Sequence, residues 1–385
     1  MPMRIALLTT WFPPVIVGSG NRFYELGKRL AAKHEIHVYT TGIPGTVREE
    51  EMDGMQVHRY GIFDPSKKSI EKESTVLSLI LSGRLLTEKS SELIRGFKSF
   101  DLVDCNIVSK VLPYVASLIS KSMHIPLIET WHEVWYEQNF TQYSPFRALP
   151  GFVLESLMPW FSDINIAVSE TTKRRLIELL RVNPHKIVVI SNGVDLKKFE
   201  AKGEKTYGRI LYVGRLERHK RVDRLLLAYE RLKRVHPEIE LIIIGKGPQK
   251  EYLQHFSEKL KLENVTFLDP LPYERLLEVM KSSWIVVQPS IREGQGIVLL
   301  EAMAAGTPPI AVQAKGSAVG DVIKNNDNGL LVPEGGMERA IHRLLTDDDL
   351  YQQLRKQGLT FVRAYDWAIL ANKVDEIYEK LEETR

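Results

Sequence analysis

Two carboxylates lie eight residues apart in the stretch SIREGQGIVLLEAMAAGTPPIAV, residues 290–312. Glu301 is the one charged residue between Ile297 and Pro309, so we expect it to have apolar surroundings. A buried carboxylate is costly unless hydrogen-bond donors satisfy it. Vicinal sugar hydroxyls would supply such donors, and so would an Arg or Lys of the protein, so both explanations stay open from this stretch alone.

A loop with two glycines separates Glu293 from the segment that begins at Ile297. Its residues are Gly294, Gln295 and Gly296, and the strand-like run WIVVQPS precedes them. The segment after the loop is predicted to be a short helix, which the following Gly and Pro residues end. Because a helix N-terminus presents backbone N–H groups, the loop would suit a phosphate.

Two cations follow another strand-like run, RILYVG. Arg215 and Lys220 come after this run and before a helical segment, a position that suits a diphosphate. Two exposed basic residues are an equally good explanation of this stretch taken alone. After the next strand, the turn at residues 245–248 has small residues that allow close backbone approach. Gly18, Ser19 and Gly20 similarly predict an open cradle between the first strand and the first helix.

The elements that must position these residues are short strands alternating with helices along the whole chain. Several strand candidates are apolar without alternation, as in a sheet covered on both faces. This order predicts an α/β protein with parallel sheets and right-handed crossovers. The expected strands cover residues 4–9, 36–41, 55–61, 102–107, 126–130, 164–169, 187–191, 209–214, 240–245, 265–269, 284–290, 309–313 and 329–333.

The polar stretch at residues 195–208 separates two groups of strands and predicts two domains. We expect Rossmann-like, doubly wound domains at residues 1–200 and 201–365 that face each other across a cleft. Ligands of such sheets bind at the carboxyl ends of the strands. Residues 366–385 are predicted to form an amphipathic helix that crosses back to the first domain.

Composition excludes several classes of protein. The 385 residues carry a net charge of +3, too small to predict a nucleic-acid-binding protein. A single cysteine, Cys105, excludes an intramolecular disulfide and a cysteine-based metal cluster. No apolar run approaches the ~20 residues that cross a bilayer. We therefore expect a soluble cytoplasmic protein, or at most one that is peripheral at the inner face of the membrane.

Together these motifs resemble the family 4 retaining glycosyltransferases of the GT-B fold, also described as glycosyl transferases group 1. The resemblance runs from the first strand to the C-terminal helix. The matching segments are FPP at Phe12–Pro14, the family histidine at His132, AVSETT at Ala167–Thr172, the segment Ile190–Phe199, VGRL with a following lysine at Val213–Lys220, and the Glu-x7-Glu signature within Ser290–Ala304.

The resemblance implies that a nucleotide-diphospho-sugar binds mainly to the second domain. Glu301 would then accept hydrogen bonds from the ribose, and Glu293 would bind hydroxyls of the transferred sugar. Backbone groups of Gly294, Gln295, Gly296 and Ile297 would assist Glu293. Arg215 and Lys220 would hold the diphosphate without a metal or other cofactor, and the loop with Gly18 and Ser19 would close on the phosphates.

The resemblance also implies a reacting centre near His132 and an acceptor site in the first domain. His132 would contact the sugar or the acceptor hydroxyl, although a satisfied histidine at a strand end explains this residue equally well. Six aromatic residues could stack on an acceptor or simply pack a helix and loop. They are Trp131, Trp135, Tyr136, Phe140, Tyr143 and Phe146. The segment 146–161 predicts an ordinary core helix, with an interfacial amphipathic helix as the alternative.

Several residues depart from the family pattern. Gln295 stands where an apolar residue is usual, so we expect it to influence donor choice. Arg221 replaces a common glycine and would add a third cation beside the phosphates. Asp104 and Asn106 stand where many relatives have histidines, which changes the acceptor side.

The resemblance predicts retaining transfer of a hexosyl group from a UDP- or GDP-sugar to an acceptor hydroxyl in glycan, glycolipid or small-molecule glycoside synthesis. The acceptor would be a sugar, a lipid-linked sugar or a small molecule, and peripheral membrane contact is allowed. A nucleotide-sugar 2-epimerase and a non-catalytic nucleotide-sugar-binding protein are the alternatives. The sequence predicts no oligomeric state.

Overall fold

A computed structural model describes residues 1–15, 18–62, 100–108, 112–135, 145–200 and 203–383. The described chain divides into two compact units, residues 1–191 with 367–385, and residues 192–366. The boundaries predicted after residues 200 and 365 fall instead after Ser191 and Asp366. Residues just after Ser191 belong to the second unit because Val194 N–H donates to Tyr365 O at 2.9 Å and Phe199 packs into that unit's core.

The described residues of the first unit form an eight-stranded sheet in the order β3-β4-β2-β1-β5-β6-β7-β8. All pairings are parallel except that of β3 with β4. The elements are β1 (Arg4–Leu8), α1 (Gly18–Leu30), β2 (Glu35–Gly42), β3 (Glu49–Met52), β4 (Met55–Ile62), β5 (Leu102–Ile107), α4 (Leu112–Met123), β6 (Leu127–Trp131), α6 (Pro145–Leu157), η1 (Met158–Trp160), β7 (Ile164–Ala167), α7 (Glu170–Leu180), η2 (Pro184–Lys186), β8 (Ile187–Val189) and α15 (Trp367–Glu383).

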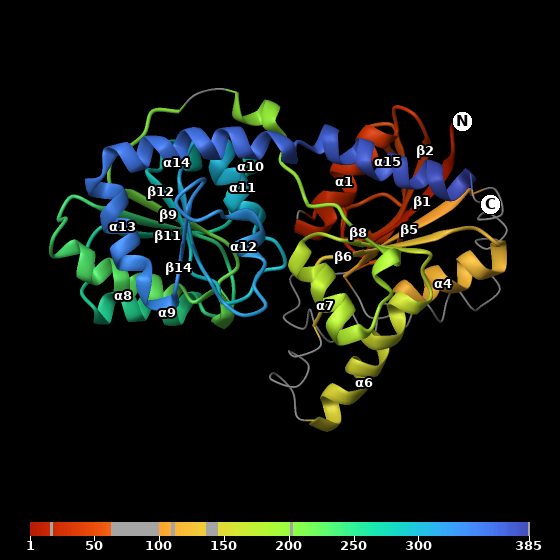
Figure 1. Cartoon of the computed structure of the whole chain (residues 1–385), viewed down its shortest axis with the longest axis horizontal. Helices are drawn as coiled ribbons and strands as arrows, with labels where there is room; N and C mark the ends of the chain where they lie inside the picture. The colour runs from red at the N-terminus through yellow and green to blue at the C-terminus, as the bar shows by residue number, and fades with distance from the viewer. Residues whose placement is uncertain (16–17, 63–99, 109–111, 136–144, 201–202, 384–385) are drawn as a thin grey trace. The chain divides into compact units, whose positions relative to one another are not determined.

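The described residues of the second unit form a six-stranded parallel sheet in the order β11-β10-β9-β12-β13-β14. The elements are η3 (Leu196–Phe199), β9 (Arg209–Val213), η4 (Arg218–Lys220), α8 (Val222–Lys233), β10 (Glu240–Ile244), α9 (Lys250–Lys259), β11 (Val265–Leu268), α10 (Tyr273–Ser282), β12 (Ile285–Gln288), α11 (Ile297–Ala304), β13 (Pro309–Val312), α12 (Val319–Val322), β14 (Leu330–Val332), η5 (Glu334–Gly336), α13 (Met337–Thr346), α14 (Asp348–Phe361) and η6 (Val362–Tyr365). Figure 1 labels most of these elements.

Each sheet has one point where the strand order reverses direction. In the first unit the chain proceeds outward from β1 to β2 and β4, and then from β5 to β8 on the other side. In the second unit the corresponding point lies between β9 and β12. In open α/β sheets, ligands bind at such a point, at the carboxyl ends of the strands. The prediction of doubly wound α/β units is confirmed.

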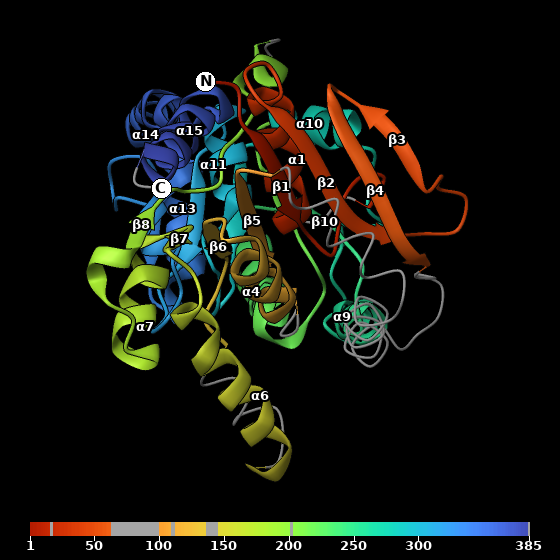
Figure 2. The same ribbon diagram turned by 90° about the vertical axis from the view of Figure 1, so that its right-hand side faces the viewer.

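The central strands are buried on both faces, as their continuous apolar runs predict. Every residue of β5, β6, β12 and β13 is buried. All thirteen predicted strands are present, and β3 is the additional one. Its sequence, EEEM, has no apolar run that would predict a strand. The strand pairs antiparallel with β4 at the edge of the sheet (Figure 2).

The C-terminal helix α15 lies beside α1 in the first unit (Figure 1). Trp367, Val374 and Tyr378 are buried there in one core cluster with residues of β1 and β2. Two polar anchors accompany this packing. Asp375 accepts from His34 and Lys33 at 2.7 and 2.6 Å, and Tyr378 Oη donates to Asp104 Oδ2 at 2.6 Å.

Helix α6 departs from its predicted role as a core helix. It extends away from the sheet of its unit (Figure 2), and it exposes Leu149, Val153, Leu154 and Leu157. Trp160, in η1 directly after it, is 65% exposed. Within the described residues, no helix is both long enough and apolar enough to cross a membrane.

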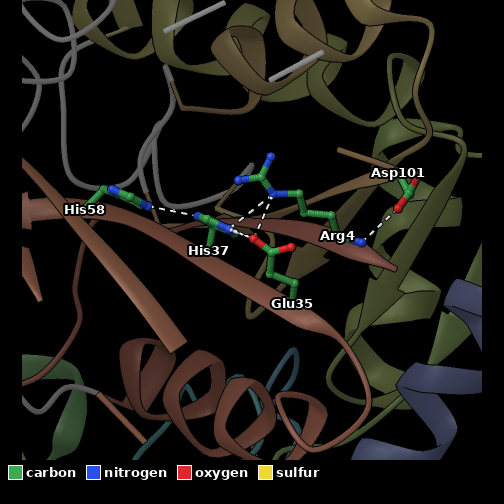
Figure 3. A network of polar contacts seen from close by, with 5 residues as sticks. All are labelled: Arg4, Glu35, His37, His58 and Asp101. Atoms are coloured by element: carbon green, nitrogen blue, oxygen red, sulfur yellow. Dashed lines mark hydrogen bonds and ion pairs between the residues drawn. The ribbon is translucent and has the colours of Figure 1, made fainter. Parts of the chain in front are cut away.

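A polar network joins residues near the amino ends of the first two strands (Figure 3). His37 Nε2 lies 2.7 Å from Glu35 Oε1, and His37 Nδ1 lies 3.0 Å from His58 Nε2 on the neighbouring strand β4. Arg4 Nε donates to Glu35 Oε1 at 3.0 Å, while the Arg4 backbone N–H donates to Asp101. Arg4 and Glu35 begin β1 and β2, so this network lies toward the amino ends of these strands.

Candidate functional site

Residues at the reversal point of the second sheet form the first part of the candidate site. Strands β9 and β12 are neighbours, with Ile210 opposite Ile285 and Leu211 opposite Val286. Lys220 follows β9, and Glu293 follows β12. The fold therefore brings together two predicted site residues that are 73 positions apart in sequence.

Lys220 and Glu293 form a shielded ion pair. Lys220 Nζ lies 2.7 Å from Glu293 Oε1, and the two side chains are only 12% and 11% exposed. Gln288 Nε2 donates to the same oxygen. Burial by itself would raise the pKa of Glu293, but the charge and hydrogen bond of Lys220, with hydrogen bonds from Ser290 and Gln288, outweigh it and lower that pKa. Glu293 is therefore a carboxylate at neutral pH.

The glycine loop between the two glutamates turns sharply into α11. Gly296 has φ +89°, a left-handed conformation that costs glycine little, and Ile297 begins the helix. Leu299 N–H donates to Gly296 O at 2.9 Å, and the N–H groups that precede it at a helix start suit an anion. The predicted helix start is confirmed.

Gln295 has a structural role in the loop that the sequence did not indicate. Its side chain is buried, its Oε1 accepts from Asn192 N–H at 2.7 Å, and its Nε2 donates to Asn192 O at 3.0 Å. Both ends of the amide form hydrogen bonds with the backbone of one residue, so the side chain holds the loop. The Asn192-Gly193 turn is therefore fastened to the candidate site.

Arg215 and Arg221, the other cations of the predicted phosphate site, pair with different carboxylates. Arg215 is 71% exposed at its side chain and pairs with Glu217 at 2.6 Å. Arg221 adopts φ +51°, which explains why glycine suits this position, and its guanidinium lies 2.8 Å from Glu334. The predicted third cation beside the phosphates is thus neutralised by Glu334, whereas Arg215 projects into solvent.

The turn after β10 confirms the predicted close approach of backbones. A Cβ atom added to Gly245 would lie 1.9 Å from Gly214 O at the end of β9. One at Gly247 would lie 2.4 Å from Leu216 O. These glycines therefore let the ends of β9 and β10 pack together and fix the start of the Arg215 loop.

Glu301 has a tyrosine partner rather than the basic residue considered from the sequence. Tyr273 Oη on α10 donates to Glu301 Oε1 at 3.1 Å, and no described Arg or Lys forms an ion pair with this carboxylate. Burial raises the pKa of Glu301 to about 7, although the Tyr273 hydrogen bond opposes the rise. A ligand hydroxyl that donates to this carboxylate would stabilise its charged form.

At the reversal point of the first sheet, the predicted glycine loop is part of a helix. Gly18, Ser19 and Gly20 form the first turn of α1. A Cβ atom on Gly20 would lie 2.6 Å from Trp11 O, so this turn packs directly on the chain that leaves β1. The prediction of an open loop is wrong, but its residues still lie at a helix N-terminus.

Asn106 and His132 lie together near this helix start. Asn106 is fully buried at the end of β5, and its Nδ2 donates to Ser19 O at 2.9 Å and to Thr9 Oγ1 at 3.0 Å. Its Oδ1 lies 2.7 Å from Nε2 of His132, which follows β6. Burial and the Arg22 guanidinium lower the pKa of His132 to about 3, so the imidazole is neutral at physiological pH.

Ser169 and Trp131, from two further segments noted in the sequence, have structural roles. Ser169, in the AVSETT motif, caps α7 because its hydroxyl accepts from Thr172 N–H at 3.0 Å. Trp131 is buried, with Nε1 donating to Asn165 at 2.7 Å, so it belongs to the core rather than to an acceptor surface. Tyr136, Phe140 and Tyr143 lie outside the described residues.

Four residues of the site were not predicted from the sequence. Gln288 and Ser290 bind Glu293, and Tyr273 binds Glu301. Asn106 was noted only as a departure from the family pattern, and its link to His132 was not anticipated. Polar residues that end the apolar runs WIVVQPS and LVDCNI are the signal that could have indicated Gln288 and Asn106. In the described part of the chain, no group of three His, Cys, Asp or Glu residues could hold a metal ion.

Comparison with known families gives two adjoining matches. The model described as Glycosyltransferase Family 4 matches residues 16–198, and the model described as Glycosyl transferases group 1 matches residues 194–361. Among curated proteins, a glycogen synthase of Mycobacterium tuberculosis is 27% identical over 98% of this chain and 94% of its own length. A phosphatidyl-myo-inositol mannosyltransferase of Mycobacterium leprae is 32% identical over 66% of this chain and 67% of its own length.

Solved structures share the architecture across the whole chain. A sucrose-phosphate synthase from Thermosynechococcus elongatus has a TM-score of 0.82 at 21% identity and covers 100% of both chains. HepE of Anabaena, solved with UDP-glucose, has a TM-score of 0.74 at 17% identity and covers 98% of this chain and 100% of its own. At this level of identity the likeness establishes the GT-B fold.

Proposed function

The chain belongs to the family 4 glycosyltransferases, and on that premise we propose that it moves a hexosyl group from a UDP- or GDP-sugar to an acceptor hydroxyl with retention of configuration. The observation that carries the proposal is the Lys220–Glu293 pair at the reversal point of the second sheet. It combines a cation suited to a phosphate with a carboxylate suited to sugar hydroxyls. The UDP-glucose complex of HepE supports a nucleotide-sugar donor of this class.

In this proposal Lys220 serves two partners. An ammonium group has three N–H donors, so the hydrogen bond to Glu293 leaves donors for the oxygens of a diphosphate. Arg215, exposed on the preceding loop, would join Lys220 there and stabilise charge on the departing nucleotide. Glu293 would bind sugar hydroxyls, and Glu301 would accept from the ribose.

His132 would orient a hydroxyl rather than remove its proton. A group whose pKa is lowered to about 3 is a weak base at neutral pH. The leaving phosphate is the better proton acceptor, in keeping with a front-face transfer in which it deprotonates the acceptor. The helix N-terminus at Gly18 and Ser19 would contribute a second anion site from the first unit.

We propose that this chemistry needs no metal and no other cofactor, because Lys220 and Arg215 would supply the positive charge that a metal otherwise supplies. A chelator should then leave the rate unchanged. Loss of activity that Mg²⁺ or Mn²⁺ restores would contradict the proposal.

For the acceptor we propose a hydroxyl of a sugar, of a lipid-linked sugar or of a small molecule. The apolar residues exposed on α6, including Leu149 and Val153, would allow peripheral contact with a membrane. Sedimentation with anionic vesicles tests this contact, with Leu149→Ser and Val153→Ser as the variant. If the variant and the wild type sediment equally with the vesicles, the exposed residues of α6 do not mediate membrane contact.

A panel of UDP-, GDP- and ADP-sugars in a thermal-shift assay tests the donor proposal. The true donor should raise the melting temperature with its concentration, since binding to the folded state stabilises it. Donor hydrolysis and transfer are then measured on the hits. Conversion of the donor to its 2-epimer would favour an epimerase instead, whereas binding without any turnover would favour a non-catalytic protein.

A further inference from the structure

The hydrogen-bond partners of Asn106 determine which end of its side-chain amide is the nitrogen and which is the oxygen. Asn106 Nδ2 contacts Ser19 O at 2.9 Å, and a backbone carbonyl oxygen can only accept a hydrogen bond. The second contact, with Thr9 Oγ1 at 3.0 Å, agrees because the Thr9 hydroxyl donates its own hydrogen to Trp11 O at 3.1 Å. Both partners of this end of the amide are acceptors, so it must be the NH₂ group.

The other end of the amide determines the tautomer of His132. Asn106 Oδ1 can only accept, so His132 Nε2, 2.7 Å away, must carry a hydrogen. A neutral imidazole has one N–H, and the Nδ1 atom of His132 therefore presents a lone pair. No described residue forms a hydrogen bond with Nδ1.

The four residues linked by these hydrogen bonds come from different elements and meet at one place in the fold. Thr9 follows β1, Ser19 lies in the first turn of α1, Asn106 is the last residue but one of β5, and His132 follows β6. Strands β1 and β5 flank the reversal point of the first sheet, where a ligand-binding crevice is expected. Asn106 is fully buried, so its contacts connect these elements from within.

We propose that Asn106 is a positioning residue that fixes His132 as the Nε2–H tautomer, so that Nδ1 accepts a hydrogen bond from a hydroxyl of the sugar or of the acceptor. The assignment of that hydroxyl rests on the proposed transferase function. Asn106 itself touches no substrate in this scheme. An imidazole with Nδ1–H would instead donate a hydrogen bond to the oxygen of that hydroxyl.

Histidine ¹⁵N NMR of the whole chain tests the tautomer directly. Long-range ¹H–¹⁵N spectra distinguish protonated from unprotonated ring nitrogens, and the spectrum of His132→Gln identifies the signals of His132. We expect Nε2–H with an unprotonated Nδ1, and no titration between about pH 5 and 8. An Nδ1–H tautomer, or a titration midpoint near the ordinary value of ~6.5, would overturn the inference. This measurement needs no variant at Asn106 and no substrate.

Two substitutions test the consequence for catalysis. Asn106→Ala removes the acceptor, so His132 should become a mixture of tautomers and kcat should fall about 10- to 100-fold. Asn106→Asp keeps the size and the acceptor for His132, although it loses the donor to Ser19 O. Its carboxylate favours an imidazolium and should make His132 titrate near neutral pH with a similar loss of kcat. The affinity of the nucleoside diphosphate, which the second unit would mainly bind, should change less than kcat does in both variants.

The possible failures are separable. If Asn106→Asp retains both the wild-type kcat and a neutral His132, the positioning role is wrong. If the wild-type protein transfers no sugar while its His132 is the Nε2–H tautomer, the proposed function fails and the tautomer assignment stands. An active enzyme with the Nδ1–H tautomer would overturn this inference alone.

Discussion

Lys220 Nζ lies 2.7 Å from Glu293 Oε1, with both side chains largely shielded from water, at the reversal point of the second sheet. The pair is electrically balanced before any ligand arrives. A diphosphate would compete with Glu293 for the ammonium, while sugar hydroxyls would supply replacement donors to Glu293. Binding of the complete donor would therefore preserve partners for both charges, which neither a nucleotide nor a free sugar would do alone.

We expect Lys220→Ala to lower kcat about 100-fold or more, since it would remove the cation proposed to face the leaving group and leave Glu293 shielded without its cation. Arg215→Ala should cost less because Arg215 is exposed. The double substitution should abolish turnover. Arg218→Ala is the matched control, since Arg218 is an exposed cation on the same short helix as Lys220. A near-normal kcat in the double variant would refute the assignment.

Nucleotide affinity should rise with pH through about 7 because burial raises the pKa of Glu301 to that value. Below it the carboxyl is mostly protonated, and ribose hydroxyls that donate to a carboxylate favour the ionised form. Calorimetric titration with the nucleoside diphosphate from pH 6 to 8 measures the slope. Glu301→Gln should flatten it, and Glu301→Ala should weaken the nucleotide and the sugar nucleotide alike. Unchanged affinity in Glu301→Ala would count against ribose recognition.

The fastening of the glycine loop by Gln295 predicts a coupled loss of stability and activity. Gln295→Leu has nearly the same size but removes both hydrogen bonds to Asn192, at a cost of roughly 1–3 kcal/mol of unfolding free energy. The Glu293 loop should become less ordered, so KM for the donor should rise and kcat should fall. Gln313→Leu, at an exposed position of the same unit, is the control. If Gln295→Leu changes donor preference without loss of stability, Gln295 contacts the donor after all.

The sequence predicts the strands well because their signal is local. Apolar runs such as LVDCNI and ELIII need no knowledge of their neighbours, whereas the acidic EEEM of β3 is a strand only because β4 lies beside it. The start of α1 is misjudged for a similar reason. Gly18 and Gly20 are typical of a loop, but Gly20 is required by the contact with Trp11 O.

Sequence motifs could also indicate candidate site residues, but they could not indicate how these residues interact. Gln295 and Asn192 are 103 residues apart, and Asn106 and Ser19 are 87 apart, so no local pattern connects them. The amide of Gln295 is a departure from the family motif that sequence reasoning assigned to the ligand. Its partner is the backbone, and only the fold brings the two together.

The His37–His58 pair predicts a loss of stability below about pH 6.5 (Figure 3). His37 Nδ1 lies 3.0 Å from His58 Nε2, and His37 Nε2 lies 2.7 Å from Glu35 Oε1 and 3.3 Å from Arg4 Nε. Burial, followed by the charge of His37, lowers the pKa of His58, although Glu49 on β3 opposes the shift and Arg4 adds to it. The unfolded chain then binds more protons than the folded one, so the free energy of unfolding falls as pH decreases below the unfolded value.

His58→Gln should reduce that acid sensitivity, because a glutamine amide can still donate to His37 Nδ1 but cannot gain a charge. The urea midpoint measured at several values between about pH 5 and 7 should vary less in this variant than in the wild type. His185→Gln is the control, since His185 is exposed on the same unit. If His58→Gln keeps the wild-type dependence on pH, the destabilising proton binds elsewhere and the His37–His58 contact is not the sensitive element.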